Sequence, residues 1–555
     1  MAAAAGLSVT LVPVLMVLFV RGRIRPESAN PLNRVLVRLY RPVIQRVLRH
    51  PWWTLGLAGL LLLLSLWPMT RLGSEFIPPL DEGDVLYMPT TLPGVSPGKA
   101  AEILQQTDRI LKTFPEVETV FGKVGRADTA TDPAPLTMIE TTIRLKPRDQ
   151  WRPGLTQAGL IEAFDAALQI PGMGNVWVQP IRNRIDMLAT GIKSPVGLRI
   201  SGPDLAVINR IGGEIEGVLK PIEGTVSAFA ERVDGGRYIE LHPYREQLAR
   251  YGLSIAQFNR IVAVAVGGQN IGQTVEGLAR YPINLRYPRQ WRDSVAALES
   301  LPVLTADGQT LTLGGIAEVA IVDGPPMIKS ENARPTGTVF VDIRGRDLGS
   351  YVAEAKRAVA AQVALPAGYS ITWAGQFEYL ERAAQRLRLV IPVTLAIIFV
   401  LLYLSFGRWP EALLIMGTLP FALIGGVWLI WALGHAVSVA SAIGFIALAG
   451  VSAEFGVIML IYLDQALRRY RESGETLSDD GLDAAIIEGA VQRVRPKAMT
   501  VAVIVAGLLP MFWGAGTGSE IMQRIAAPMI GGMISAPLLS MLVLPAAYKL
   551  IHGRR

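Results

Sequence analysis

The residues that could carry chemistry include a methionine in polar surroundings. In LTMIETTIRLKP, strict alternation along an extended strand places Ile139, Ile143 and Leu145 on one face. Met138 then falls on the opposite, polar face. Thioether sulfur is a soft ligand that selects Cu(I) and similar ions, whereas most methionines in a membrane protein serve packing. From the residues alone, both roles stay open for Met138.

A second candidate pair is an acid and an amine in apolar stretches. Glu454 lies in the middle of GFIALAGVSAEFGVIMLIYL, and Lys497 opens the next stretch in RVRPKAMTV, with Thr500 one turn on. A lone carboxylate at the centre of a membrane helix costs about 2.5–3.5 kcal/mol, so we expect it to be paired or protonated. On adjacent helices the two groups could exchange partners as a proton arrives, which a proton-coupled transporter requires. The alternative is structural, with Lys497 reaching the interface and Glu454 making a hydrogen bond.

Motifs of ATP-driven transporters and of zinc hydrolases are absent from the sequence. It contains no Gly-x4-Gly-Lys-Ser/Thr phosphate loop, no Asp-Lys-Thr-Gly and no His-Glu-x-x-His. It has no cysteine, which excludes disulfides and thiolate metal sites. We therefore expect a secondary active transporter without a cofactor, and not an enzyme. The only histidines are scattered: His50, His242, His435 and His552.

The elements that must position these residues are membrane helices and one large insert. Only 18% of the 555 residues are charged, against about 25% in a soluble chain. The deficit lies in seven apolar stretches of the length that a bilayer span needs. The net charge of +7 comes from arginines beside these stretches, which favours lipid headgroups over nucleic acid. The expected spans are 4–20, 53–69, 389–406, 412–433, 437–463, 498–513 and 525–547.

The distribution of Lys and Arg predicts the orientation. They gather after the first span, between the fifth and sixth, and at the C-terminus, but not in the turns 434–436 and 514–520. The positive-inside rule then places the C-terminus in the cytoplasm and 71–388 outside. It also leaves Met1 outside, so we expect an N-terminal half upstream. The predicted organisation is span 1–20, cytoplasmic amphipathic helix 21–52, span 53–70, extracytoplasmic 71–388, three spans in 389–464, cytoplasmic loop 465–497, and two spans with a tail in 498–555.

The long insert alternates strand-like and helix-like segments. The strand-like segment DVLYMPTT is followed by a helical stretch and then by the strand-like segment VETVFGKV. The strand-like segments VGLRIS and GTVFVDIRG are each followed by a helical stretch as well. Repeated βαβ units of this size predict α+β subdomains of ferredoxin-like type. The segment at about 238–322 has shorter elements and is expected to form a separate docking lobe. The predicted fold class is therefore a seven-span α-helical membrane bundle with a large α+β insert.

Several long motifs resemble the heavy-metal efflux branch of the resistance-nodulation-division (RND) transporters. They are GSEFIPPLDEGDVLYMPTTLPG, IRNRIDMLATGIKSPVGLRISG, ARYPINLRYPRQWRDS, GFIALAGVSAEFGVIMLIYLDQA and RVRPKAMTVAVIVAGLLP. More narrowly, they resemble the copper/silver pumps of that branch, and the likeness covers the whole chain as the C-terminal half of such a pump. The resemblance implies a proton/metal antiporter of the bacterial inner membrane, with 71–388 as a periplasmic pore and docking domain. It also implies a homotrimer that works with a periplasmic adaptor and an outer-membrane channel.

The resemblance also implies a Cu(I)/Ag(I) site. Its three methionine ligands match Met88, Met138 and Met187, and its neighbouring polar residues match Glu140 and Lys193. Three thioethers would form a neutral trigonal cage that discriminates against Zn(II), Co(II) and Ni(II). Two alternatives remain: a divalent-cation pump with the methionines as packing, or a transport-inactive metal-binding fragment.

Further positions correspond to the transport pathway of the family. Asn270 replaces a methionine of the periplasmic relay, so that step is expected to differ here. Glu454, Lys497 and Thr500 match the proton relay. The family also has three pairs of methionines that relay the metal. Met1, Met16 and Met522 each match one methionine of one such pair.

Overall fold

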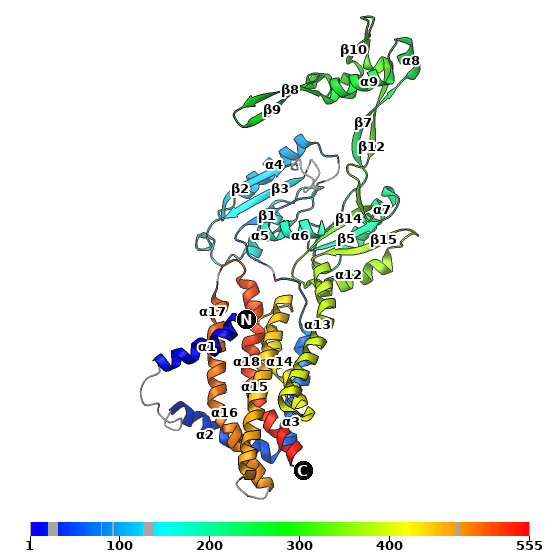
Figure 1. The fold of residues 1–555 in the computed structure, drawn as a ribbon. Helices are drawn as coiled ribbons and strands as arrows, with labels where there is room; N and C mark the ends of the chain where they lie inside the picture. Colours follow the sequence, from blue (N-terminus) through cyan, green and yellow to red (C-terminus); the bar gives the residue numbers. More distant parts are fainter. Residues whose placement is uncertain are drawn as a thin grey trace. The chain divides into compact units, whose positions relative to one another are not determined.

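The computed structural model describes residues 2–19, 31–78, 80–91, 94–125, 138–472, 478–514 and 516–553. The chain divides into two compact units (Figure 1). The helical unit comprises Met1–Gly83, Gly345–Ala353 and Gln376–Arg555. The insert unit comprises Asp84–Arg344 and Glu354–Gly375, and it carries the strands of all five sheets among the described residues.

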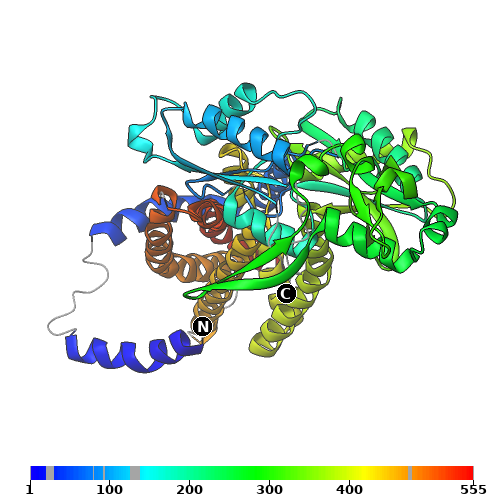
Figure 2. The same cartoon turned by 90° about the horizontal axis from the view of Figure 1, so that it is seen from above.

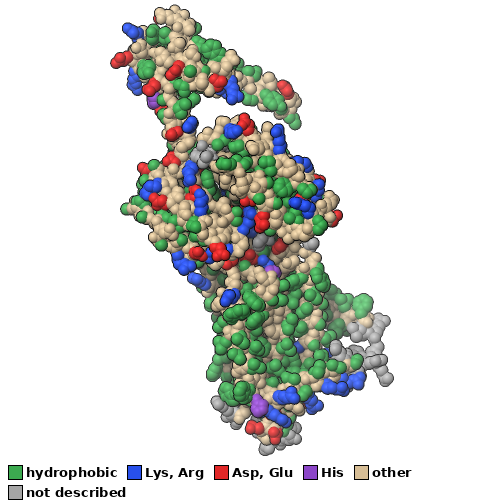
Figure 3. All heavy atoms as spheres, turned by 180° about the vertical axis from the view of Figure 1, so that it is seen from behind, with side chains coloured by type: hydrophobic (Ala, Val, Ile, Leu, Met, Phe, Trp, Pro, Cys, Tyr) green, Lys and Arg blue, Asp and Glu red, His purple; other side chains and the backbone are tan. Residues whose placement is uncertain are grey.

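The helical unit is built from long apolar helices, and hydrophobic side chains cover much of its surface (Figure 3). Six of the described helices are long and apolar enough to cross a membrane. They are α3, α13, α14, α15, α18 and the stretch Asp479–Trp513. The apolar part of α1, Gly6–Phe19, is shorter. The described helices therefore provide six of the seven expected spans. The helices are α1 Ala2–Phe19, α2 Pro31–Arg49, α3 Pro51–Arg71, α13 Gln376–Phe406, α14 Trp409–Ala432, α15 Val439–Glu472, α16 Asp479–Leu508, α17 Pro510–Trp513 and α18 Ser519–His552.

Small residues let the central helices approach closely. A Cβ atom on Gly425 of α14 would lie 2.0 Å from the carbonyl oxygen of Gly531 of α18. The reverse substitution would bring a Cβ to 2.2 Å from the carbonyl oxygen of Gly425. Such close backbone contact is a common way to pack membrane helices, which lack a hydrophobic driving force between them. The same α18 also packs against α15 and α16, so it forms the centre of the unit.

The predicted amphipathic helix is present as α2. Its apolar residues Ile44, Val47 and Leu48 are buried in the hydrophobic core of the helical unit. Its Tyr40 hydroxyl donates a hydrogen bond to the Met541 carbonyl at 2.8 Å. Its apolar face therefore packs against the other helices of the unit.

The insert unit contains two antiparallel sheets with the same pattern of elements. The first sheet has the order β2-β3-β1-β4. The second has the order β13-β14-β5-β15, and β6 also pairs with β14. The first set comprises β1 Val85–Tyr87, α4 Pro97–Lys112, β2 Val117–Val124, β3 Ile139–Leu145, α5 Gln157–Ala167, β4 Trp177–Val178 and α6 Pro180–Thr190. The second comprises β5 Val196–Ser201, α7 Leu205–Leu219, β6 Thr225–Ala230, β13 Lys329–Glu331, β14 Arg334–Ile343, the part of α12 Leu348–Gln362 from Glu354 onward, and β15 Ser370–Gly375.

Besides the two sheets, the insert unit contains a separate lobe. A long antiparallel pair of strands, β7 and β12, connects this lobe to the rest of the unit. The lobe's own core includes Phe258, Leu298 and Ile316. The β8–β9 hairpin extends from this lobe as an arm (Figure 2). The predicted docking lobe at about 238–322 falls on these elements. They are β7 Gly236–Pro243, α8 Arg245–Arg250, α9 Ile255–Val262, β8 Gln269–Glu276, β9 Ala279–Leu285, α10 Val295–Glu299, β10 Pro302–Leu304, β11 Thr310–Thr312, α11 Leu313–Ile316 and β12 Ala317–Gly324.

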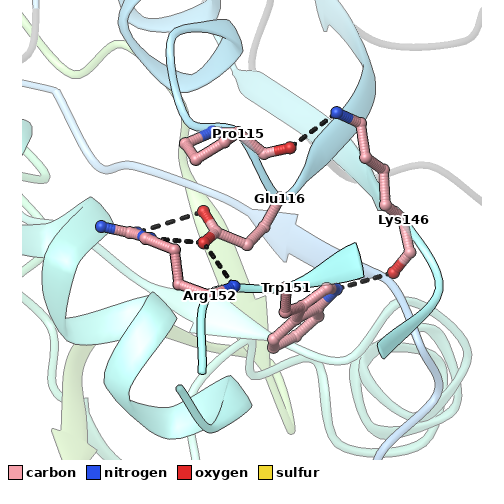
Figure 4. A network of polar contacts seen from close by, with 5 residues as sticks. All are labelled: Pro115, Glu116, Lys146, Trp151 and Arg152. Carbon is pink, nitrogen blue, oxygen red and sulfur yellow. Dashed lines mark hydrogen bonds and ion pairs between the residues drawn. The ribbon is translucent and has the colours of Figure 1, made fainter. Parts of the chain in front are cut away.

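An ion pair with a buried carboxylate lies at the edge of the first sheet (Figure 4). The Glu116 side chain is fully buried, and its carboxylate accepts hydrogen bonds from Arg152 Nε at 2.5 Å and Nη2 at 3.1 Å. Trp151 Nε1 donates to the Lys146 carbonyl at 2.7 Å, and Lys146 Nζ donates to the Pro115 carbonyl at the same distance. The guanidinium of Arg152 lowers the pKa of Glu116.

We expect Glu116→Gln to destabilise the chain by about 1–2 kcal/mol at pH 7, because a charge-assisted bidentate pair is lost. Because the pKa of Glu116 is lowered in the folded state, its contribution is present above an unfolded pKa of about 4.3. It is lost as the pH falls through the lower folded value. Thermal unfolding of the chain at pH 7 and at pH 3 measures the difference. The control Glu102→Gln removes an exposed pair with Lys99 and should leave the unfolding temperature unchanged.

Candidate metal site

Met88 lies at the end of β1 and is fully buried. Its backbone N–H donates to the Val176 carbonyl at 2.9 Å, just before β4. On the other side of β1, Tyr87 pairs with Thr141 of β3. Continuing this antiparallel register by one residue places Met88 opposite Glu140. The backbone of Met88 is therefore held by the bond to Val176, and the register of β1 with β3 places it opposite Glu140.

The register also shows which methionines share a face of the sheet. Directly opposed residues in an antiparallel pair point to the same side, as do alternate residues along a strand. Met138, two residues before Glu140, therefore shares a face with Met88. Met138 is half-buried. The predicted alternation in β3 is confirmed, because Ile139, Ile143 and Leu145 are the buried side chains of the other face.

Met187 comes from α6, which follows β4 directly. Pro180 occupies the first turn of this helix, where its missing N–H costs nothing. The helix ends at Gly191, whose φ of 70° is the left-handed conformation that glycine tolerates best. Asn183 and Met187 are one turn apart and so lie on the same side of α6. Short connections at both ends thus fix the helix relative to the sheet.

The side chain of Asn183 brings two of the predicted ligands together. Its Nδ2 donates to Met88 Sδ at 3.0 Å and to Met187 Sδ at 3.3 Å. The Asn183 residue is only 4% exposed. Sequence reasoning missed Asn183, although its spacing of four residues from Met187 in NRIDM placed it on the same face of a helix.

The two polar residues predicted beside the site have partners of their own. Glu140 forms an ion pair with Lys123 on β2 at 2.6 Å. Lys193 Nζ donates to Thr90 Oγ1 at 2.6 Å, two residues beyond Met88, and lies 5.3 Å from the centre of the Phe340 ring. Burial lowers the pKa of Lys193 to about 8. Both charges are therefore held close to the ends of β1 and β3, and the carboxylate is neutralised by Lys123.

The donor set of this site is soft. Across the described ranges, no group of three or more His, Cys, Asp or Glu side chains is arranged to hold a metal ion. Met88 and Met187 converge on one amide, and Met138 lies on the same sheet face as Met88. Uncharged thioether sulfurs in a buried position suit a soft monovalent cation and are poor ligands for hard or borderline divalent ions.

The residues of the predicted proton path lie on neighbouring helices of the helical unit. Lys497 on α16 is 1% exposed, and its Nζ donates to Ser540 Oγ on α18 at 2.9 Å. The Lys497 amine also lies 5.6 Å from the centre of the Phe455 ring on α15. Glu454, the preceding residue of α15, is exposed on the surface of this unit. Lys497 is thus paired with Ser540, which the sequence did not single out.

Thr500 lies one turn after Lys497 on α16, and the remaining described pathway residues lie on α1, α18 and β8. Thr500 Oγ1 donates to the Pro496 carbonyl one turn earlier at 3.1 Å. Met16 on α1 and Met522 on α18 are 57% and 49% exposed, whereas Met1 lies outside the described residues. Asn270 on β8 accepts a hydrogen bond from Asn284 Nδ2 on β9 at 3.0 Å.

Comparison with known proteins identifies the family. Residues 1–552 match the AcrB/AcrD/AcrF family. The chain belongs to this family. It is accordingly a multi-pass protein of the inner membrane with a large periplasmic part, and the predicted resemblance to RND transporters is confirmed.

Relatives within the family include cation efflux proteins. The chain is 55% identical to the cation efflux system protein CusA of Escherichia coli K12 over 557 residues, which cover 100% of this chain and 53% of that protein. It is 54% identical to the putative cation efflux system protein SilA of Salmonella typhimurium, with the same coverage. A crystal structure of a heavy metal efflux pump is 29% identical, with a TM-score of 0.84, and the match covers 95% of this chain and 53% of that one. The chain thus spans about half the length of these AcrB/AcrD/AcrF relatives.

Proposed function

We propose that this chain supplies the metal-binding cleft and part of the proton path of a proton-driven Cu(I)/Ag(I) efflux pump, as its C-terminal half. The observation that carries the proposal is the convergence of the Met88 and Met187 sulfurs on one buried amide. The third thioether, Met138, lies on the same face of the sheet as Met88. The relatives named as cation efflux proteins support export as the purpose of this site.

The type of donor favours Cu(I) and Ag(I) over divalent ions. Zn(II), Co(II) and Ni(II) bind best through imidazole, carboxylate or thiolate groups. The described part of the chain offers no group of three or more His, Cys, Asp or Glu side chains. The identity to a cobalt-zinc-cadmium resistance protein CzcA is 37%, against 55% to CusA. The thioether donors, together with the lower identity to a relative named for divalent ions, support a site for a soft monovalent ion.

Titration of the purified chain with metal ions tests this proposal. We expect the detergent-solubilised chain to bind one equivalent of Ag(I), and a hundredfold excess of Zn(II), Co(II) or Ni(II) not to displace it. Displacement by a divalent ion would instead support the divalent-cation alternative. Failure to bind any of these ions would contradict the proposed site.

We infer finer features of the fold from the same observations. A βαββαβ series in each of the two larger sheets supports the ferredoxin-like arrangement that the sequence predicted, and the second sheet has β13 as an additional strand. We assign the seventh span to α1, whose stretch Gly6–Phe19 carries no charged residue and is apolar apart from Ser8 and Thr10. In this assignment the C-terminus is cytoplasmic, and the insert unit is periplasmic, as the positive-inside rule predicts.

The assembly that we propose is a homotrimer, completed by an N-terminal half and working with a periplasmic adaptor and an outer-membrane channel. The β8–β9 hairpin supports association with a second copy. It is exposed along nearly its whole length and carries the apolar side chains of Ile271, Val275 and Tyr281 at 55–62% exposure. A long exposed strand pair with apolar side chains is a surface that proteins normally cover with a partner.

Coupling to protons is proposed through Lys497, Glu454 and Thr500. The buried Lys497 amine, which donates to Ser540, is the observation that supports it. An amine buried within membrane helices is costly and is expected to serve transport. Metal would pass between the cleft and the membrane by way of Met16 and Met522, each paired with a residue of the other half.

A further inference from the structure

The amide of Asn183 contacts both sulfurs in an orientation that chemistry dictates. A thioether sulfur carries no hydrogen and can only accept a hydrogen bond. The NH2 group of Asn183 must therefore face Met88 and Met187, and it has one hydrogen for each sulfur. The distances of 3.0 and 3.3 Å both lie within the range for hydrogen bonds to sulfur.

The two sulfurs need this support to different degrees. Met88 is fully buried at the end of β1, so its side chain is already confined. Met187 is half-buried on α6, and a methionine side chain has three rotatable bonds. Without a partner, Met187 would sample several rotamers, and binding an ion would have to order it. Asn183 lies one turn before Met187 and is almost fully buried, so it can hold the Met187 sulfur beside that of Met88.

We propose that Asn183 is a positioning residue of the thioether site, which holds the Met88 and Met187 sulfurs together before the metal ion arrives. This inference rests on the proposed function. A thioether sulfur has two lone pairs, so a cation can bind through the one that does not accept from the amide, and a hydrogen bond breaks only where the ion takes its place. Sulfur is a weak hydrogen-bond acceptor, so the cost of breaking such a bond is small. The ordering of Met187 outweighs that cost, and the amide therefore strengthens metal binding.

The experiment uses the full chain in detergent with methionines labelled at the 13C-methyl group. Asn183→Leu has a similar volume and no donor, and Asn183→Asp keeps the shape of asparagine but, when ionised, has no hydrogen to donate. In the metal-free chain we expect both variants to shift the Met187 methyl signal toward the value of a freely rotating side chain. The exposed Arg184 on the same helix provides the control, Arg184→Gln, which should leave that signal in place. A Met187 signal that is unchanged in both variants would overturn the proposal.

Silver titration of the same samples gives the second measurement. We expect Asn183→Leu to weaken Ag(I) binding about fivefold, because Met187 must be ordered upon binding. Arg184→Gln should bind Ag(I) like the unmodified chain. Equal or tighter binding by Asn183→Leu would show that the amide competes with the ion instead of preparing the site. If the unmodified chain binds no silver, the proposed function fails, whereas the methyl signals still test the role of Asn183.

Discussion

Replacing Met138 by isoleucine should abolish Ag(I) binding by the chain while leaving its thermal unfolding unchanged. Isoleucine is apolar and similar in volume, so the half-buried position beside β3 should accept it at a cost of less than about 1.5 kcal/mol. It has no sulfur, however, and the proposed trigonal set would keep only Met88 and Met187. We expect the dissociation constant to rise at least about a hundredfold, which corresponds to roughly 2.7 kcal/mol. Isothermal titration with Ag(I) measures this loss.

A matched control is available in the same unit. Met173 is also half-buried and packs against the apolar cluster between α4, α5 and the first sheet. Met173→Ile should bind Ag(I) like the unmodified chain, because this methionine is not among the three proposed ligands. Unchanged silver affinity in the Met138→Ile variant would remove Met138 from the site. Equal losses in both variants would indicate a general effect of methionine replacement.

Local patterns in the sequence predicted the elements that carry the site. The alternation around Met138 predicted a strand with Ile139, Ile143 and Leu145 on its buried face, and β3 has this arrangement. An amphipathic helix was predicted within 21–52, and α2 spans Pro31–Arg49 of that range. These features depend on residues that are close in the sequence, where side-chain periodicity is set by the geometry of the strand or the helix.

The convergence of the ligands could not be derived from such patterns. Met88 and Met138 share a face because β1 pairs with β3 in one particular register. Met187 joins Met88 because α6 follows β4 on the other side of β1. Met138 and Met187 lie 50 and 99 positions after Met88 in the sequence, and only the family resemblance indicated that they come together. Asn183 was missed because no pattern marks a hydrogen-bond donor to sulfur.

The proton path shows the same limit. The sequence placed Glu454 and Lys497 on neighbouring membrane helices, and α15 and α16 do pack together. It did not indicate that Lys497 donates to Ser540, which lies 43 residues later on α18. Helical periodicity identifies which side of one helix is buried. It does not identify the polar group of another helix that a buried side chain contacts.

In a complete pump that contains this chain, Glu454→Gln should stop metal transport without changing metal binding. Glu454 is exposed on α15, at the middle of a helix that is long and apolar enough to cross a membrane. A carboxylate there is costly unless it meets protein or water, so its presence indicates a function. Glutamine keeps the size and the hydrogen bonds of this side chain but cannot take up or release a proton. Proton-coupled flux of Ag(I) or Cu(I) into proteoliposomes should therefore fall at least about a hundredfold, as for the loss of an essential proton carrier.

The interpretation of this variant depends on two comparisons. Ag(I) binding should remain unchanged, because Met88, Met138 and Met187 all lie in the insert unit, whereas Glu454 belongs to the helical unit. Glu488→Gln makes the same chemical change at an exposed ion pair with Arg469, and this variant should transport normally. Normal proton-coupled flux in Glu454→Gln would exclude Glu454 from the relay. Loss of transport together with retained metal binding would separate the proton path from the thioether site, since proton coupling would then have failed while the site still bound metal.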